Sequence, residues 1–346
     1  MIRIMPRRSR DVRYYTEDQA RELDGLRPSA GWWLRGDGDA SDPDRVAGVL
    51  GSSPRARVLG YDIIVAAPRP VSVLLALDES AGAGLVRAHR ESVAAALRYL
   101  EDRALSVRVR RGGMNAQWSA RWESVVSFTH GVNRHGDPHL HDHVLVGARP
   151  EGEDTVLDAR SLRAHQVAAD ALYRAHLRVE LARRTGWVAW RSFGGLEAVT
   201  GVDEGYRTLW GGHHDERGTK RHYSREAARS EWARALSRYQ PEAEVVPPSR
   251  ALDVHAFAAA FEGLTRITRS HVVASWADAQ VFGARADRIE SGVDVALPEL
   301  IASRGLEGPS VGITRVRSLD LEGWHERERA RQRSRVREDS RSLRER

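Results

Sequence analysis

The sequence predicts an α+β fold in which helices flank a central antiparallel β-sheet, followed by a largely helical C-terminal part. Three observations lead to this prediction. Short runs of β type, such as 60–67 and 139–145, are apolar or alternate between polar and apolar residues and are bounded by turn residues. Two long stretches, 85–105 and 164–184, repeat apolar residues at helical spacing. After residue 190 one helical pattern follows another.

The N-terminal elements follow from alternation and helical spacing. Residues 1–5 alternate as in a short strand, and residues 6–10 form a basic turn. The helical pattern over 11–23 begins with two adjacent tyrosines, Tyr14 and Tyr15. An unperturbed phenol has a pKa of about 10, so a tyrosine nucleophile needs a nearby metal or base. The alternative is an ordinary helix start with one tyrosine in the core and one on the surface.

Residues 31–44 are predicted to form a solvated loop. Its acidic run resembles a calcium loop but lacks the required Gly and the bidentate Glu at their positions. The adjacent Trp32 and Trp33 have two interpretations, either exposed platforms on which unpaired bases stack or a buried flap on the core.

The predicted strand 60–67 is apolar apart from Asp62. A buried carboxylate needs a partner, so Asp62 either orients a metal-binding histidine, accepts a proton from a tyrosine, or lies in water at the end of its strand. The prolines at 68 and 70 end the strand, and an apolar helix begins at Val71. The helix 85–105 follows from its apolar spacing.

The stretch 128–146 contains five of the fourteen histidines. Along 139–145 every second side chain faces the same way, so His139, His141 and His143 share one face of a strand. The preceding run 122–128 is also typical of a strand.

A Gly/Pro/Asp turn over 133–138 joins the two runs into a predicted antiparallel hairpin. The hairpin brings His130 beside His141 and His143. Three imidazoles with open coordination positions are typical of a catalytic metal site. The alternative is a polar hairpin face that is merely rich in histidine.

The second half is predicted to be mainly helical. A strand at 155–157, the helix 164–184 with Gly186 as its C-cap, and a strand at 187–190 come first. The expected helices then cover 204–209, 224–238, 255–264, 269–279 and 285–302. The proline-rich stretch 239–251 is either a linker or an excursion, and we expect His213 and His214 to be surface residues.

Composition excludes several classes of protein. With no cysteine there is no disulfide or thiolate site, so a metal has to be held by histidines and carboxylates. The single lysine, Lys220, lies in Gly-Thr-Lys-Arg, which excludes a P-loop nucleotide site. Without a long apolar run or a secretory leader, we expect no membrane span and a cytoplasmic location. A net charge of +6 favours a polyanionic partner, but 48 acidic residues among 54 basic ones restrict the positive field to local patches.

Taken in order, four segments resemble conjugative relaxases of the MobF class, within the HUH endonucleases. They are the early tyrosine pair, GYDIIVAAPRPVS, FTHGVNRHGDPHLHDHVLV and ALYRAHLRVEL. The resemblance covers 10–190 well and the stretches 224–236 and 268–297 more loosely. The histidine motif, F-x-H followed by D-P-x-L-H-x-H, is its most specific part.

The resemblance implies an HUH relaxase-like sheet and a set of site residues. The metal ligands fall on His130, His141 and His143, whereas His139 stands where the family has a variable polar residue. The family's carboxylate falls on Asp62. Its first tyrosine pair falls on Tyr14, taken as the nucleophile, and Tyr15, the fallback.

This chain departs from the family pattern at two places. The second tyrosine pair found in many members is missing, since residues such as Glu22 and Leu23 occupy its positions, which puts a second cleavage in doubt. Arg69 and Pro70 stand where a lysine and a serine are usual.

The implied activity is nicking and rejoining of single-stranded DNA at an origin of transfer through a 5′-phosphotyrosine, with a divalent metal and no nucleotide. Mg²⁺ or Mn²⁺ is expected, with Zn²⁺, Co²⁺ and Ni²⁺ as alternatives. Expected partners are the origin-of-transfer DNA, an accessory DNA-binding protein, a coupling protein and a type IV secretion machinery, and the chain is expected to be a monomer.

The alternatives are a rolling-circle replication initiator with the same chemistry, a histidine-cluster metal hydrolase without a covalent intermediate, and a DNA-binding protein without activity. We expect a catalytic core over 1–240, a helical part over 241–320 and an arginine-rich tail over 321–346.

Overall fold

The structure is a computed structural model of the whole chain. It describes residues 1–13, 15–16, 31–36, 39–51, 57–111, 114–133, 135–150, 155–192, 196–203, 205–210, 225–239, 245, 247–249, 257, 261 and 267–303.

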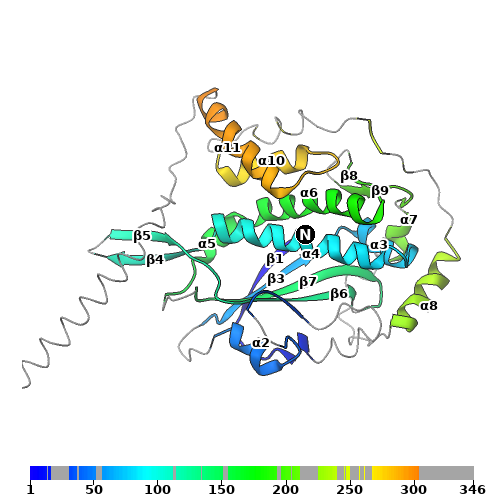
Figure 1. Cartoon of the computed structure of the whole chain (residues 1–346), viewed down its shortest axis with the longest axis horizontal. Helices are drawn as coiled ribbons and strands as arrows, with labels where there is room; N and C mark the ends of the chain where they lie inside the picture. Colours follow the sequence, from blue (N-terminus) through cyan, green and yellow to red (C-terminus); the bar gives the residue numbers. More distant parts are fainter. Residues whose placement is uncertain are drawn as a thin grey trace, which may run out of the picture.

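A five-stranded antiparallel sheet lies at the centre of the fold (Figure 1). Its strand order is β1-β3-β7-β6-β2, so β6 and β7 are the only neighbouring strands in the sheet that are also consecutive in the chain. The strands in this order are β1 (Ile2–Arg7), β3 (Gly60–Ala66), β7 (Pro138–Gly147), β6 (Val125–Val132) and β2 (Trp32–Arg35). The predicted α+β class with an antiparallel sheet is confirmed.

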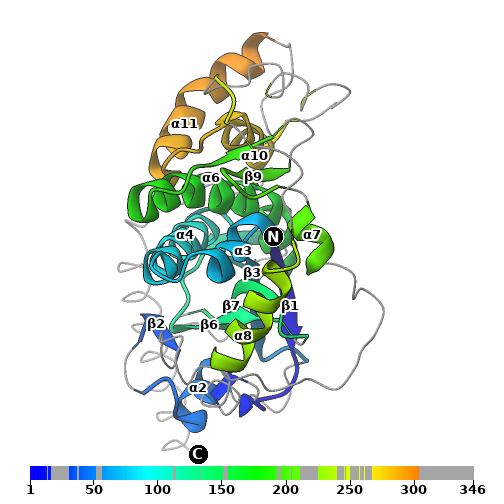
Figure 2. The same ribbon diagram turned by 90° about the vertical axis from the view of Figure 1, so that its right-hand side faces the viewer.

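Helices cover both faces of the sheet (Figures 1 and 2). On one face α3 (Arg69–Leu77), α4 (Gly82–Arg103) and α6 (Gln166–Thr185) enclose the larger hydrophobic core together with alternate strand residues such as Ile63 and Val144. On the other face a smaller core forms against α2 (Pro43–Val49). Because side chains alternate along a strand, β2, β6 and β7 contribute to both cores, whereas the apolar residues of β1 and β3 face the larger one.

The predictions for the two edge strands need correction. β1 continues through Pro6 and Arg7, which we expected in a turn, because a proline is tolerated on an edge strand where its missing N–H faces outward. Residues 32–35, predicted as part of a loop, form β2 by pairing with β6. The residues around 32–35 have the composition of a loop, and this short run forms a strand because it pairs with β6.

Other elements were not predicted. The helix α2 begins at Pro43 behind the N-cap Asp42, whose carboxylate accepts hydrogen bonds from two backbone N–H groups, and this Asp-Pro start is visible in the sequence. The strands β4 (Ser106–Arg111) and β5 (Met114–Ser119) form a hairpin that projects from the body (Figure 1).

The predicted strand 155–157 is wrong, since it makes only an isolated bridge between Leu157 and Val107 before α5 (Ala159–Ala164).

The helix α6 ends at Gly186, as predicted, with φ of 78° in the left-handed region that favours glycine. The chain then forms the short antiparallel pair β8 (Ala189–Arg191) and β9 (Glu197–Val199), the second of which was not predicted. The later helices are α7 (Gly205–Leu209), α8 (Arg225–Leu236), α10 (Arg269–Ala279) and α11 (Ala286–Ser303).

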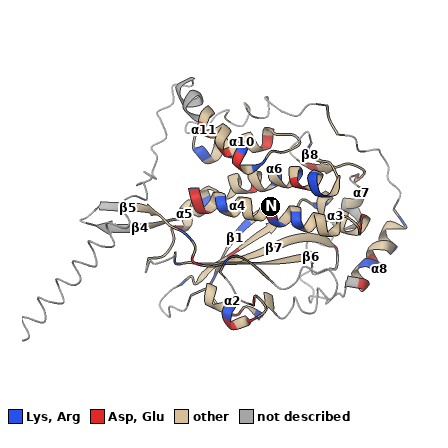
Figure 3. Cartoon of the chain, viewed as in Figure 1, with Lys and Arg blue, Asp and Glu red and all other residues tan. Residues whose placement is uncertain are grey.

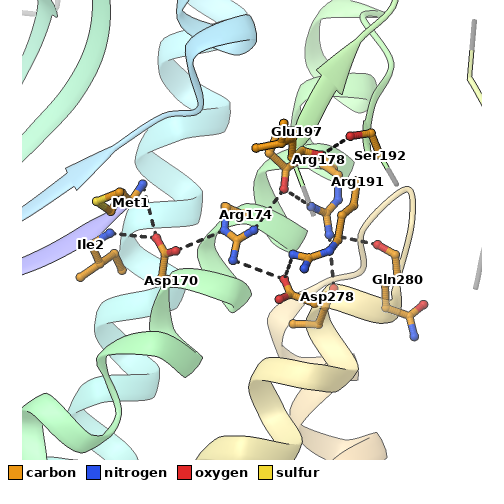
Figure 4. A network of polar contacts seen from close by, with 12 residues as sticks. Met1, Ile2, Asp170, Arg174, Arg178, Arg191, Ser192, Glu197, Asp278 and Gln280 are labelled. Carbon is orange, nitrogen blue, oxygen red and sulfur yellow. Dashed lines mark hydrogen bonds and ion pairs between the residues drawn. The ribbon is translucent and has the colours of Figure 1, made fainter. Parts of the chain in front are cut away.

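A network of ion pairs ties α6 to the later elements (Figure 4). Arg178 on α6, whose side chain is 1% exposed, bonds Glu197 on β9 at 2.6 Å. Arg174 bonds Asp170, Glu197 and Asp278, and Arg191 also bonds Asp278 on α10. Buried charges require such pairing, so α10 is fixed against α6 rather than tethered loosely.

Basic and acidic residues are interleaved along the helices that cover the larger core (Figure 3). No described helix is long and apolar enough to cross a membrane. The histidine pair His213 and His214, most of the predicted helix 255–264, most of the proline-rich stretch and the tail lie outside the described residues.

Candidate metal centre and active site

The predicted histidine hairpin is present, and its turn is held by an asparagine. Asn133 Oδ1 accepts hydrogen bonds from the backbone N–H groups of His135 and Asp137, at 2.8 and 3.0 Å. Gly136 adopts φ of 86°, which a glycine reaches without strain. This turn joins β6 to β7 in the register that places His130 directly opposite His141.

The hairpin brings His130, His141 and His143 together on the face of the smaller core. One ring nitrogen from each lies within 4.8 Å of the other two, and the residues are 2%, 8% and 8% exposed. The ring centroids are 5.0 to 5.3 Å apart. These three histidines have the spacing of a metal site, and no other group of histidines, aspartates or glutamates among the described residues does.

Hydrogen bonds orient two of these rings. His143 Nδ1 lies 2.9 Å from Asp62 Oδ2, and His141 Nδ1 lies 2.9 Å from the carbonyl oxygen of His139. Both partners are acceptors, so each ring carries its proton on Nδ1 and keeps the Nε2 lone pair for a ligand role. Burial and the neighbouring imidazoles, His130 first, hold the pKa of His141 well below its ordinary value, which favours the neutral form that binds metal.

Asp62 links the histidines to a tyrosine. Its Oδ2 also accepts a hydrogen bond from the Tyr15 hydroxyl at 2.8 Å, and Asp62 is only 6% exposed. The Tyr15 ring is 1% exposed, stacks on Phe128 with centroids 5.5 Å apart, and lies 5.4 Å from the His143 ring. Of the three roles open to Asp62, the solvated strand end is therefore wrong. Tyr14 lies outside the described residues.

His139 shares the face of His141 but does not belong to the cluster of three histidines. Its ring centroid is 4.6 Å from that of His141, yet its nitrogens are outside the set that lies within 4.8 Å. Burial, followed by the positive charge of Arg69, lowers the pKa of His139 to about 4.

Asp142, between His141 and His143, belongs to a buried network that sequence reasoning missed. It points to the opposite face, where Oδ1 lies 3.0 Å from His89 Nε2 and Oδ2 accepts from the Ser127 hydroxyl at 2.6 Å. His89 Nδ1 in turn lies 2.7 Å from the Tyr173 hydroxyl. Burial raises the pKa of Asp142, but His89 and the hydroxyl donors together lower it to about 2. The sequence offered one signal for this network, because Asp142 lies on the apolar face of its strand between Leu140 and Val144.

The tryptophan pair fits the flap interpretation. Trp32 packs against the larger core and lies 5.2 Å from the guanidinium of Arg90, whereas Trp33 packs against the smaller core. Both are half-buried.

Comparisons with known proteins place this chain in a family. A family model described as TrwC relaxase matches residues 9–216. The metal-bound structure of the conjugative relaxase TrwC in complex with oriT DNA is 19% identical, with a TM-score of 0.54, and covers 69% of this chain and 98% of its own. The complex of TrwC with mutant oriT DNA has the same identity and coverage and a TM-score of 0.52. No curated protein sequence matches the chain.

At 19% identity these structures establish the fold alone. The family model carries the assignment further, because it spans more than half of the chain and includes the helical turn of Tyr15, Asp62 and all three clustered histidines. The chain belongs to the TrwC relaxase family.

Proposed function

We propose that this protein nicks and rejoins one strand of DNA at an origin of transfer through a covalent 5′-phosphotyrosine intermediate. Relaxases of this family are metal-dependent transesterases that nick DNA. The observation that carries the proposal is the cluster of three buried imidazoles, with nitrogens within 4.8 Å of one another, in a chain of that family.

The donor set fits a divalent metal. His130, His141 and His143 would hold it, two of them through Nε2 because their Nδ1 atoms are engaged elsewhere. A divalent ion on three neutral ligands keeps its full charge and so supplies positive charge to the non-bridging oxygens of a scissile phosphate. We propose Mg²⁺ or Mn²⁺ on the basis of cellular supply, although imidazole suits Mn²⁺, Zn²⁺, Co²⁺ and Ni²⁺ better than Mg²⁺.

Tyr14 is the proposed nucleophile. Its phenol oxygen bonds to phosphorus, the bond from phosphorus to the 3′-oxygen breaks, and the products are a 5′-phosphotyrosine and a 3′-hydroxyl. Asp62 is the proposed acceptor of the phenol proton, and the departing 3′-oxygen takes up a proton. The aryl phosphodiester retains the reactivity of the original bond, so the reverse reaction rejoins the strand.

Single-stranded DNA is the proposed substrate, since a phosphate has to reach both the histidines and a tyrosine. The structures of TrwC with oriT DNA support DNA as the partner. Arginine contacts to phosphates are expected to set the affinity and its salt dependence, while base contacts set the sequence preference.

The test is covalent trapping. The protein is incubated with Mn²⁺ and labelled single-stranded oligonucleotides that tile the DNA of its own genetic element, and SDS-resistant adducts are mapped by mass spectrometry. We expect an EDTA-sensitive adduct on Tyr14, lost in Tyr14→Phe and in His141→Gln but kept in the control His139→Gln. An adduct on Tyr15 would correct the nucleophile, and no adduct with any oligonucleotide would refute the proposal.

The same experiment separates the alternatives. Cleavage without an adduct, unaffected by Tyr14→Phe, would indicate a metal hydrolase, and binding that survives replacement of all three histidines by alanine, without cleavage, would indicate an inactive DNA-binding protein. A rolling-circle initiator forms the same adduct, so a mating assay with an origin-bearing plasmid distinguishes transfer from replication.

The wider setting remains part of the proposal. We propose a cytoplasmic monomer that works with an accessory DNA-binding protein, a coupling protein and a type IV secretion machinery. We also retain the proposed catalytic core over 1–240, the helical part over 241–320 and the arginine-rich tail over 321–346.

A further inference from the structure

We propose that Tyr15 is a positioning residue that couples the candidate metal centre to the N-terminal helical turn in which Tyr15 lies, and that the two adjacent tyrosines therefore have different roles. The catalytic consequence of this inference rests on the proposed function. The coupling itself rests on contacts among described residues and is measurable without DNA.

The surroundings of Tyr15 are those of an anchor. Its ring is 1% exposed and stacks on Phe128, on the same strand as His130. The guanidinium carbon of Arg7 lies over the Tyr15 ring, 5.4 Å from its centroid. The backbone N–H groups of Tyr15 and Thr16 both donate to the carbonyl oxygen of Val12, at 2.8 and 3.2 Å, which closes the turn. Burying this large ring fixes the turn against the sheet.

The hydroxyl of Tyr15 connects this anchor to the histidines. It donates to Asp62 Oδ2, the same oxygen that lies 2.9 Å from His143 Nδ1. A phosphodiester cannot approach a hydroxyl that is enclosed in this way without displacing the tyrosine. The side chain is therefore suited to fix the turn to which it belongs rather than to attack phosphorus itself.

The shared carboxylate makes the two sites interdependent. A cation held by His143 would polarise the imidazole and strengthen its Nδ1–H as a donor to Asp62. The orientation of Asp62 then becomes better defined, which favours the docked position of the Tyr15 hydroxyl. Because coupling between sites is reciprocal, loss of that hydroxyl also weakens metal binding.

The test compares Tyr15→Phe with Tyr99→Phe. Each variant removes one hydroxyl from a buried tyrosine, but the Tyr99 hydroxyl bonds His165 at 2.9 Å and is not part of the histidine cluster. Hydrogen exchange of a peptide covering residues 8–16 is measured with and without Mn²⁺, and Mn²⁺ affinity is measured by calorimetry.

In the wild type and in Tyr99→Phe we expect Mn²⁺ to slow exchange of the peptide several-fold. In Tyr15→Phe we expect that slowing to disappear and the affinity for Mn²⁺ to fall about 5-fold, the lower end of typical coupling. At saturating Mn²⁺, adduct formation by Tyr15→Phe should slow about 10-fold while the adduct stays on Tyr14, because a positioning defect acts on the rate of the chemical step.

Two results would overturn the inference. One is metal-dependent protection in Tyr15→Phe equal to that of the wild type, and the other is an adduct on Tyr15 itself. If the wild type forms no adduct with any oligonucleotide, the proposed function fails, whereas the exchange and calorimetry results still decide whether Tyr15 and the metal centre are coupled.

Discussion

Replacement of Asp62 by asparagine tests how the metal centre is built. The carboxylate receives two donors, the Tyr15 hydroxyl at 2.8 Å and His143 Nδ1 at 2.9 Å, both at Oδ2. Asparagine offers one acceptor oxygen and adds an N–H donor, so the two donors lose their shared charged acceptor. Loss of an outer partner of a ligating histidine typically costs 10- to 100-fold in metal affinity, or about 1.4–2.7 kcal/mol.

The assay is calorimetric titration of Mn²⁺ into Asp62→Asn at neutral pH, with Asp142→Asn as the matched control. Both substitutions replace a buried carboxylate by its isosteric amide in the sheet, but Asp142 faces the opposite core and bonds His89. We expect a 10- to 100-fold weaker affinity for Asp62→Asn and a change of less than about 3-fold for the control. Equal losses in the two variants, or no loss in the first, would refute the assignment of Asp62 as the group that orients His143.

Three further predictions concern stability. Asp142→Asn removes a buried charged acceptor and should lower the free energy of unfolding in urea by about 3 kcal/mol; a loss below about 1 kcal/mol would contradict the importance of that network. Gly283 has φ of 82°, and a Cβ there would lie 2.1 Å from a carbonyl oxygen of α6, whereas Gly186 has φ of 78° and open space around it. Gly283→Ala should therefore lower the free energy of unfolding in urea by about 3 kcal/mol and Gly186→Ala by only about 1 kcal/mol. Equal losses would show that the steric clash is not the cause. Burial, followed by a neighbouring arginine, lowers the pKa of His139 and of His165 from 6.5 to about 4, so in the metal-free protein each is neutral when folded but protonated when unfolded as pH falls below about 6.5. As the pH falls from about 6.5 to 4, each histidine should therefore reduce the free energy of unfolding by up to about 1.4 kcal/mol per pH unit. His139→Gln should remove one such contribution from the slope of the free energy of unfolding against pH. An unchanged slope would contradict the lowered pKa of His139.

Features encoded over a few residues were predictable. The two-residue period of 139–145 placed His141 and His143 on one face, and the turn residues predicted the hairpin that brings His130 beside them. The strand around Asp62 and the helix ending at Gly186 also follow from local patterns. The strand β2 could not be predicted in the same way, because an edge strand of four residues is stabilised by pairing with β6 rather than by its own composition.

The sequence by itself determined which histidines can cluster, since their number and their alternation on a strand are properties of neighbouring residues. Only the tertiary structure decided that Asp62 bonds both Tyr15 and His143, that Tyr15 is enclosed, and that Asp142 serves the opposite core. The physical reason is separation along the chain. Asp62 lies 47 residues from Tyr15 and 81 from His143, and these groups meet because β3 pairs with β7 under a buried N-terminal turn, an arrangement that depends on how the whole sheet packs.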